Sequence, residues 1–161
     1  MNPTKLKIVT AKEAQTLVNK WKKERLNVVF TNGCFDILHL GHVDYLEKSR
    51  NLGDKLIVAI NDDESVRRLK GENRPINDLF FRSRVLAALD FVDAVIPFKE
   101  DTPLEVIRQL LPDILVKGSD YERSNIIGAD VVEQNGGSVR TIDLVEGIST
   151  SSIVEKIKGL N

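Results

Sequence analysis

The two histidines of this 161-residue chain, His39 and His42, are three positions apart, and Gly41 directly precedes the second. They follow an apolar, β-prone run at residues 28–31, so they fall where a strand ends and a helix begins. Side chains at this spacing share one helix face, and a glycine between them lets a ligand approach the backbone. A helix start also offers unpaired N–H groups, which suit phosphate. The pattern therefore indicates phosphate contact; local capping and a metal pair are the alternatives, although no third ligand motif accompanies the histidines.

A second predicted helix start places three consecutive hydroxyl groups, those of Ser149, Thr150 and Ser151, shortly after Gly147. One hydroxyl is enough to cap a helix, so the others are available to a ligand. Together with the N–H groups of the helix start, they suit phosphate groups.

Short apolar runs alternate with helical patterns along the chain. Strands are expected at residues 28–31, 56–60, 94–97, 114–116 and 139–142. Helices are expected at residues 11–25, 43–52, 63–69, 81–89, 103–111, 126–134 and 149–157. This alternation predicts an α/β fold, a single Rossmann-like domain with a doubly wound parallel sheet of five strands and flanking helices. Ligands of such sheets bind at the carboxyl ends of the strands, where the histidine pair also lies.

The two terminal helices are expected to pack differently. Ile153, Ile157 and Leu160 should anchor the last helix to the core, since they repeat at helical spacing. The first helix precedes the first strand and is expected to form an extension, residues 1–26, packed on a main domain at residues 27–161.

The composition excludes several classes of protein. A hydrophobic share of 42%, a charged share of 29% and a net charge of −1 are ordinary for a globular domain and give no sign of a nucleic-acid partner. No apolar run approaches the roughly 20 residues that cross a bilayer, and the first residues lack the pattern of a signal peptide. Cys34 is the single cysteine and is more readily explained as a small buried residue than as a nucleophile. We therefore expect a cytoplasmic protein without a membrane or nucleic-acid partner.

Three segments of the chain resemble a known family. The sequence HLGH at residues 39–42 matches the HxGH motif of the nucleotidylyltransferase superfamily, and NGCFD at residues 32–36 and GISTSS at residues 147–152 resemble its cytidylyltransferase-like branch. The resemblance extends over residues 27–158 and implies the nucleotidylyltransferase fold. It also implies the reaction, in which a phosphate monoester attacks the α-phosphorus of a nucleoside triphosphate and expels pyrophosphate without a covalent intermediate. Mg²⁺ is implied as well, held mainly by the triphosphate.

The resemblance assigns roles to individual residues. At the catalytic centre it places His39, His42, Lys70 and Arg82. Against the nucleotide it places Thr31, Asn32, Gly33, Phe35, His39, Gly41, His42, Lys117, Gly118, Asp120, Gly147, Ser149, Thr150 and Ser151. Against the acceptor it places Asp36, Asn61, Lys70, Arg74 and Arg82. Asp36 is also a possible metal ligand, with a local Asx turn as the alternative, and each basic residue taken alone is more often a solvated charge.

Longer segments narrow the resemblance, among them TNGCFDILHLGHVDYLEKSRNLGDKLIVAINDD at residues 31–63 and EGISTSSIVEKI at residues 146–157. They are similar to the heptose 1-phosphate adenylyltransferases of bacterial ADP-heptose synthesis. This implies transfer of AMP from ATP to D-glycero-β-D-manno-heptose 1-phosphate, for the inner core of lipopolysaccharide, with a separate sugar kinase as pathway neighbour and a homo-oligomeric assembly. A CTP-dependent glycerol-3-phosphate cytidylyltransferase is the runner-up, and a regulatory nucleotide-binding module is the non-enzyme alternative.

Overall fold

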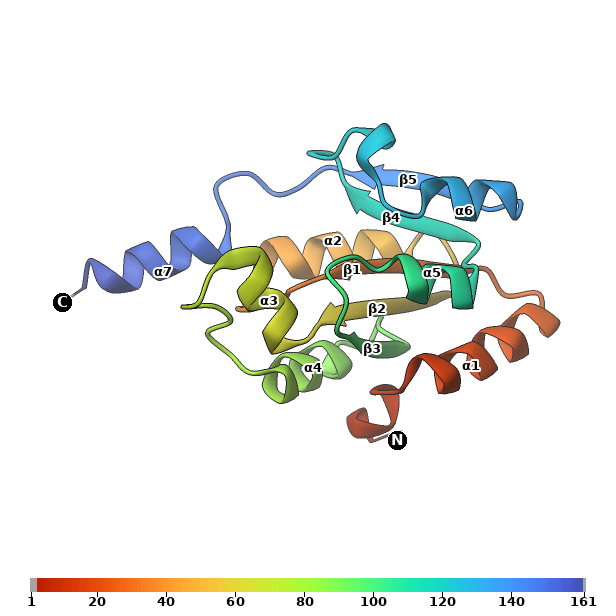
Figure 1. Cartoon of the computed structure of the whole chain (residues 1–161), viewed down its shortest axis with the longest axis horizontal. Coiled ribbons are helices and arrows are strands. Elements are labelled where there is room, and N and C mark those ends of the chain that lie inside the picture. The colour runs from red at the N-terminus through yellow and green to blue at the C-terminus, as the bar shows by residue number, and fades with distance from the viewer. Residues whose placement is uncertain (1–2, 161) are drawn as a thin grey trace.

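Five parallel strands form one sheet in the computed structural model, which describes residues 3–160 (Figure 1). The strands are β1 (Val28–Gly33), β2 (Lys55–Asn61), β3 (Ala94–Phe98), β4 (Ile114–Gly118) and β5 (Ser138–Ile142). Their order across the sheet is β3-β2-β1-β4-β5, and every pair of neighbours is parallel. The predicted α/β fold with a doubly wound sheet is therefore confirmed. Between β1 and β4 the strand order reverses, which is where ligands of open α/β sheets bind.

Helices precede, connect and follow the strands. The α-helices are α1 (Ala11–Lys23), α2 (Leu40–Arg50), α3 (Asp63–Lys70), α4 (Leu79–Ala88), α5 (Leu104–Leu110), α6 (Ala129–Gln134) and α7 (Thr150–Lys158). Two short 3₁₀ helices are η1 (Thr4–Lys7) and η2 (Arg123–Asn125). Side chains cap several starts: the Asp62 carboxylate accepts from the backbone N–H of Ser65 at α3, and Asp78 accepts from Phe81 at α4. None of the helices among residues 3–160 is long and apolar enough to span a bilayer.

Two apolar layers lie on opposite faces of the sheet because successive strand residues point to opposite sides. Val28 and Phe30 of β1 face a cluster that includes residues of α1, α5 and α6. Val29, between them, faces a second cluster that includes residues of α2 and α4. With both faces covered, the strands are apolar throughout, which is why the sequence shows them as continuous apolar runs.

The first helix belongs to one of these layers. Ala14, Val18 and Trp21 of α1 are buried in the same cluster as the β1 side chains. Helix α1 is held at its start by a capping box between Thr10 and Glu13. Whether residues 1–26 form a separable extension stays a prediction.

The last helix differs from expectation. No residue of α7 is buried; the side chains of Ile157 and Leu160 are 54% and 78% exposed, so the prediction that they anchor the helix to the core is wrong. Figure 1 shows α7 extending away from the sheet at one end of the molecule, attached through the segment that follows β5. Helical spacing of apolar residues indicates an amphipathic helix, but it does not say which surface, if any, covers that face.

The remaining differences concern the ends of elements. Strands β1 and β4 run two residues further than predicted, through Gly33 and Gly118, because polar and glycine residues at the carboxyl edge still pair with their neighbours, as Gly33 does with Ile60. Helix α2 begins three residues earlier than predicted, at Leu40, directly after His39. The histidine pair therefore straddles the first turn of α2.

Candidate active site

A cavity of about 640 Å³ opens at the carboxyl edge of the sheet. Its walls come from the segments that follow β1, β2, β3, β4 and β5 and from the first turns of α2 and α7. Most predicted site residues line it, namely Asn32, Gly33, Phe35, Asp36, His39, Gly41, His42, Asn61, Lys70, Arg74, Lys117, Gly118, Asp120, Ser149, Thr150 and Ser151. Thr31, Arg82 and Gly147 do not line it. The fold thus brings residues more than 100 positions apart into one cavity.

The histidine rings lie against each other. The centroids of His39 and His42 are 3.8 Å apart with planes inclined by 24°, and Phe35 meets the His42 ring edge-on at 5.3 Å. His39 occupies the N-cap position of α2, yet its side chain makes no capping hydrogen bond. Local capping, the alternative that the sequence allowed, is therefore not what the His39 ring does.

Both imidazoles favour the neutral form. Burial lowers the pKa of His39, and burial together with the neighbouring His39 charge lowers the pKa of His42 to about 4. A neutral imidazole still carries one N–H group and can donate it to a phosphate oxygen. The Nδ1 atoms of both rings are buried without a hydrogen-bond partner among residues 3–160, and the His39 Nδ1 packs against Gly41. The pair suits hydrogen-bond donation rather than fixed positive charge.

Gly41 explains how the two helix starts come close. A Cβ atom on Gly41 would lie 3.1 Å from the His39 ring and 3.9 Å from the carbonyl oxygen of Ile148, which directly precedes the N-cap of α7. The start of α2 and the segment leading into α7 are therefore neighbours in space. Any larger residue at position 41 would have to displace the His39 ring.

The three hydroxyl groups at the start of α7 divide into two roles. Ser149 is the N-cap: its side chain accepts from the backbone N–H of Ser152 at 3.0 Å, while the Ser152 hydroxyl bonds back to the Ser149 backbone. Thr150 and Ser151 line the cavity, and in the described part of the chain their hydroxyl groups have no hydrogen-bond partner. Gly147 has a φ of +76° and turns the chain into the helix rather than lining the cavity. A phosphate ligand would thus meet Thr150, Ser151 and the helix start itself.

Thr31 is buried beneath the cavity. Its hydroxyl donates to the carbonyl oxygen of Val116 at 3.1 Å, so the Tyr45 hydroxyl, 2.8 Å away, donates to Thr31. Thr31 is wholly inaccessible, and these bonds join β1, β4 and α2 below the site. The prediction that Thr31 contacts the nucleotide does not fit its position.

Arg82 also departs from prediction. Its side chain is 0% exposed and donates to the carbonyl oxygens of Cys34, Asn61 and Asn77 and to the Asp63 carboxylate, at 2.7–3.0 Å. Four of its five N–H groups are bonded to the protein and the side chain is fully buried, so a phosphate in the cavity does not reach it in this arrangement. The sequence could not show that Arg82 is buried, because nothing in the residues around an arginine says whether its side chain faces the protein interior or a cavity.

One end of the cavity is basic, and it carries residues that the resemblance assigned to the acceptor. Lys70 ends α3 and Arg74 lies in the loop after it, and both line the cavity beside Asn61 at the end of β2. The Asp36 carboxylate accepts from Arg74 and from the backbone of the same loop. A local Asx turn is not what Asp36 makes, since its partners are about 40 positions away.

The opposite end lies beyond β4. Burial lowers the pKa of Lys117 to about 8, although the nearby Asp120 charge opposes the shift, and the Lys117 ammonium is 5.3 Å from the ring centroid of Tyr121. A Cβ atom on Gly118 would come within 2.4 Å of the Asp120 carboxylate, so a larger residue there would displace the Asp120 side chain. Among the residues that the structure describes, Lys117 is the one basic side chain that lines this end of the cavity.

Several lining residues were not predicted. They are Cys34, Tyr45, Leu69, Asp101, Thr102, Pro103, Tyr121, Asn125, Ile127, Leu144, Val145 and Ile148. Many of them follow the carboxyl ends of β3, β4 and β5, a placement that could have identified them from the predicted strands alone. Cys34 was expected to be a small buried residue, but it is only partly buried and lines the cavity; burial raises the pKa of its thiol, which favours the neutral form.

The donor set fits Mg²⁺ carried by phosphates better than a protein-built metal site. Nowhere in residues 3–160 do three or more His, Cys, Asp or Glu side chains gather as a metal site would need. Mg²⁺ keeps several waters and commonly uses few protein ligands beside substrate phosphates. A histidine-based metal pair, the third alternative for His39 and His42, therefore lacks its other ligands.

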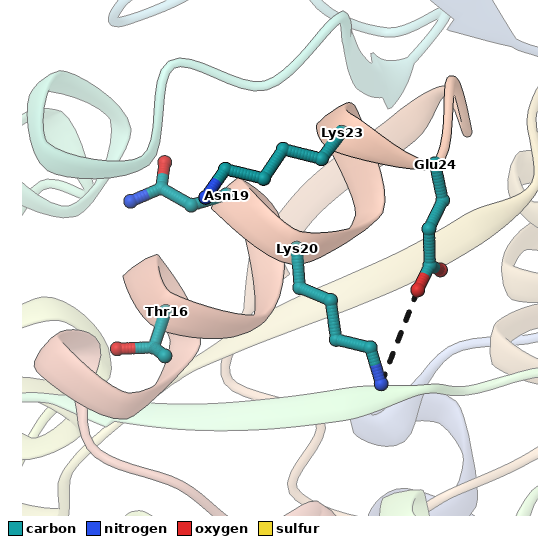
Figure 2. Close-up of a pocket in the computed structure, with 5 residues that line it drawn as sticks. All are labelled: Thr16, Asn19, Lys20, Lys23 and Glu24. Carbon is teal, nitrogen blue, oxygen red and sulfur yellow. Dashed lines mark ion pairs between the residues drawn. The ribbon is translucent and has the colours of Figure 1, made fainter.

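A second hollow, of about 510 Å³, lies on α1 and carries no comparable chemistry. Figure 2 shows its lining, Thr16, Asn19, Lys20, Lys23 and Glu24, all on one helix and its C-terminal cap, with an exposed Lys20–Glu24 ion pair at 4.0 Å. Exposed pairs of this kind contribute little, and the groups do not converge on a point. The cavity at the sheet edge is the better candidate.

Fold and site together define a class. A Rossmann-like sheet whose carboxyl edge carries a histidine pair beside a hydroxyl-bearing helix start is typical of nucleotidyltransferases. A family model described as Cytidylyltransferase-like matches residues 30–156 of this chain. The chain therefore belongs to the cytidylyltransferase-like family of nucleotidyltransferases.

Curated relatives are similar over most of this chain. The bifunctional protein HldE of Azorhizobium caulinodans is 54% identical over 151 residues, which cover 94% of this chain and 32% of the relative. The bifunctional protein HldE of Coxiella burnetii (strain Dugway 5J108-111) is 60% identical over 130 residues, 81% of this chain and 27% of the relative. The chain thus spans about a third of the length of the curated relatives that it matches.

Solved structures agree with the fold. The lipopolysaccharide core biosynthesis protein from Thermoplasma volcanium aligns with a TM-score of 0.61 at 31% identity, covering 74% of this chain and 97% of that one. A pantoate-β-alanine ligase from Francisella tularensis, solved with β-γ ATP and β-alanine, aligns with a TM-score of 0.60 at 16% identity, covering 94% and 76%. At that identity the second structure supports the fold alone.

Proposed function

We propose that this protein transfers AMP from ATP to D-glycero-β-D-manno-heptose 1-phosphate, producing ADP-heptose and pyrophosphate for the inner core of lipopolysaccharide. The observation that carries the reaction type is one cavity with two groups of residues that suit phosphate, the start of α7 with the histidine pair and the basic pair Lys70 and Arg74. The sugar follows from the resemblance to heptose 1-phosphate adenylyltransferases. A similar solved structure is described as a lipopolysaccharide core biosynthesis protein, which supports a role in lipopolysaccharide synthesis.

The chemistry needs positioning more than acid–base groups. An oxygen of the acceptor phosphate forms a bond to the α-phosphorus of ATP, while the bond from that phosphorus to the bridging oxygen breaks and pyrophosphate leaves with the electron pair. The attacking oxygen is already anionic, so no general base is required. His39 and His42 would donate hydrogen bonds to phosphate oxygens as charge grows on them, and Thr150 and Ser151 would hold the β- and γ-phosphates.

Mg²⁺ would supply charge neutralisation on the triphosphate when bound. Lys117, Gly118 and Asp120 would lie against the base and ribose at the far end, and Asn32, Gly33, Phe35 and Gly41 would form the floor between the ends. Asn61, Lys70 and Arg74 would hold the acceptor.

The decisive experiment is a matrix of nucleotides against acceptors. Purified protein is incubated with Mg²⁺, ATP or CTP, and heptose 1-phosphate or glycerol 3-phosphate, and products are identified by mass spectrometry. We expect ADP-heptose and pyrophosphate only where ATP meets heptose 1-phosphate. Faster formation of CDP-glycerol would favour the runner-up cytidylyltransferase, and binding of ATP without pyrophosphate release in any pairing would favour a regulatory nucleotide-binding module.

The cellular setting is proposed on the same basis. A cytoplasmic location fits ATP as substrate, and we expect a separate sugar kinase as pathway neighbour. The curated relatives are bifunctional and about three times as long, which leaves room in them for a second activity outside the matched part. We also propose a homo-oligomer, which light scattering on the purified protein would test through its molar mass.

A further inference from the structure

Asp36 lies inside the protein and yet holds a negative charge. Its side chain is 1% exposed. Burial alone raises the pKa of Asp36, but the backbone N–H groups of Asn77 and Ile76 and the Arg74 guanidinium outweigh burial, so the pKa lies below its ordinary value. A charge buried in this way needs its partners, because an unpaired one would cost several kcal/mol.

Both carboxylate oxygens of Asp36 are occupied by one loop. Oδ1 accepts from the N–H groups of Ile76 and Asn77 at 2.8 and 2.9 Å, and Oδ2 accepts from Ile76 at 2.9 Å and from Nε of Arg74 at 2.6 Å. The Asn77 side chain also donates to the Asp36 carbonyl oxygen at 3.0 Å. Asp36 thus ties the loop between α3 and α4 to the segment that follows β1.

Asp36 binds only one edge of the Arg74 guanidinium, the Nε edge, and does not contact the terminal nitrogens. Only Nε of Arg74 bonds to Asp36, and in the part of the chain that the structure describes the two terminal nitrogens have no protein partner. Arg74 lines the cavity beside Lys70. A guanidinium held at Nε presents its terminal N–H pair in the fork geometry that binds two phosphate oxygens at once.

The loop is also fixed from its far end. Arg82 donates to the carbonyl oxygens of Asn77, Cys34 and Asn61, so it joins the loop to the ends of β1 and β2. Its own charge is balanced by Asp63 at 2.7 Å. The Asp36 carboxylate therefore meets a rigid, already hydrogen-bonded backbone rather than a free loop.

From these contacts we propose that Asp36 is a positioning residue for the acceptor phosphate: it holds Arg74 so that the terminal guanidinium nitrogens face the acceptor end of the cavity, and it does not ligate Mg²⁺. The proposal rests on the proposed function only for the identity of the acceptor. A metal ion at Asp36 would have to displace backbone and guanidinium donors that already fill both oxygens.

The test compares Asp36→Asn, Arg74→Met and the double variant with wild-type protein, and uses Asp130→Asn, an exposed carboxylate on α6, as the matched control. Initial rates give the KM for heptose 1-phosphate, the KM for ATP and the Mg²⁺ concentration for half-maximal rate. We expect Asp36→Asn to raise the acceptor KM about 10-fold, the usual effect of losing a charge-assisted contact, and to leave the other two constants unchanged. The double variant should bind acceptor no more weakly than Arg74→Met, since both remove the same interaction.

Other outcomes would overturn the proposal. An increased Mg²⁺ requirement with an unchanged acceptor KM would make Asp36 a metal ligand, and additive effects in the double variant would make it independent of Arg74. Arg74→Lys keeps the charge but not the fork, so it should behave like Arg74→Met; wild-type acceptor binding in Arg74→Lys would contradict a positioned fork. This last variant also decides the question if Asp36→Asn does not fold.

Titration calorimetry separates this inference from the proposed function. Inorganic phosphate, used as the probe, should bind wild-type protein more tightly than either Asp36→Asn or Arg74→Met. If wild-type protein makes no ADP-heptose but shows this difference, the heptose assignment fails and the role of Asp36 stands. Equal phosphate affinity in all three proteins would refute the role of Asp36 whatever the acceptor proves to be.

Discussion

At the scale of single residues, the protonation state of each group in the cavity decides what it can do. His42, with a pKa of about 4, is neutral at physiological pH, whereas Lys117, with a pKa of about 8, is mostly charged there. Burial is the larger cause in both cases. The cavity therefore combines neutral hydrogen-bond donors with ammonium and guanidinium groups at its two ends.

Replacement of His42 by alanine should lower kcat by a factor of about 10² or more, the usual effect of removing a donor to developing charge. The KM values should change less, because the donor is most valuable in the transition state. Stopped assays of pyrophosphate release measure the rate, and thermal unfolding checks the fold. His42→Asn, which keeps an N–H donor, serves as the control; a wild-type rate in His42→Ala would remove this histidine from the mechanism.

Lys117 predicts a pH dependence with a definite sign. As pH rises through about 8 the ammonium loses its proton, so the KM for ATP should rise above that pH. In Lys117→Arg the guanidinium stays charged, and this rise should be absent.

Lys117 also predicts how stability depends on pH. The pKa of Lys117 in the folded protein lies below its ordinary value of 10.5. Between about pH 8 and 10.5 the unfolded chain therefore binds more protons, and the free energy of unfolding should increase with pH. Urea unfolding at several pH values, with Lys117→Met lacking that increase, checks this prediction.

Residue types alone could not separate Asp36, Arg74 and Arg82, which the sequence places together near the acceptor. In the structure Arg82 is buried and joins separate segments by hydrogen bonds. Asp36 is buried and binds the loop between α3 and α4, and Arg74 extends from that loop into the cavity lining. The reason is that a charged side chain can face either a ligand or another charge, and the charged partners here lie 19 and 38 positions away in the chain.

At the scale of elements, the site depends on how closely the starts of α2 and α7 approach. The sequence predicted both helices and the position of the hydroxyl groups at the start of the second, because the spacing of apolar residues and the capping residues are local signals. Their closeness at Gly41 depends on the segment after β5 crossing to α2, which is a tertiary property.

Replacement of Gly41 by alanine tests that closeness. The added methyl group would lie 3.1 Å from the His39 ring, so the ring must move, and kcat should fall about 10- to 100-fold, as expected when a reacting group is displaced by up to about 1 Å. Stability should not fall, because alanine favours a helix over glycine by about 1 kcal/mol. Gly159→Ala, where a Cβ meets its nearest neighbour at 3.6 Å, is the matched control. Unchanged kcat in Gly41→Ala would mean that the His39 ring position is not critical.

At the scale of the whole molecule, the terminal helices contribute in opposite ways. Helix α1 buries Ala14, Val18 and Trp21 in a core layer, whereas α7 buries no residue and supplies only its first turn to the cavity. One helix therefore belongs to the core, and the other contributes to the wall of the cavity.

Truncation before Ser149 should separate these two contributions. Loss of residues 149–161 should change the free energy of unfolding by less than about 1 kcal/mol, because little apolar surface is buried there, yet it should abolish binding of ATP. Deletion of residues 1–26 should instead destabilise the protein by about 3 kcal/mol or more, since it removes the buried Trp21. Chemical unfolding and calorimetry measure both effects. Marked destabilisation by the first truncation would show that α7 is covered in solution, as in an oligomer.

The sequence by itself determined the alternation of strands and helices, because the spacing of apolar residues is a local signal. It also determined the parallel sheet and the edge at which a ligand is expected, because strands joined by helices connect in few ways. Its motifs, through their resemblance to the nucleotidylyltransferases, also indicated most of the residues that line the cavity. Only the tertiary structure decided that Thr31 and Arg82 are buried under the cavity, that Asp36 holds a distant loop and that α7 stands away from the core. Burial and pairing depend on which surfaces meet in space, and that information is shared among segments far apart in the chain.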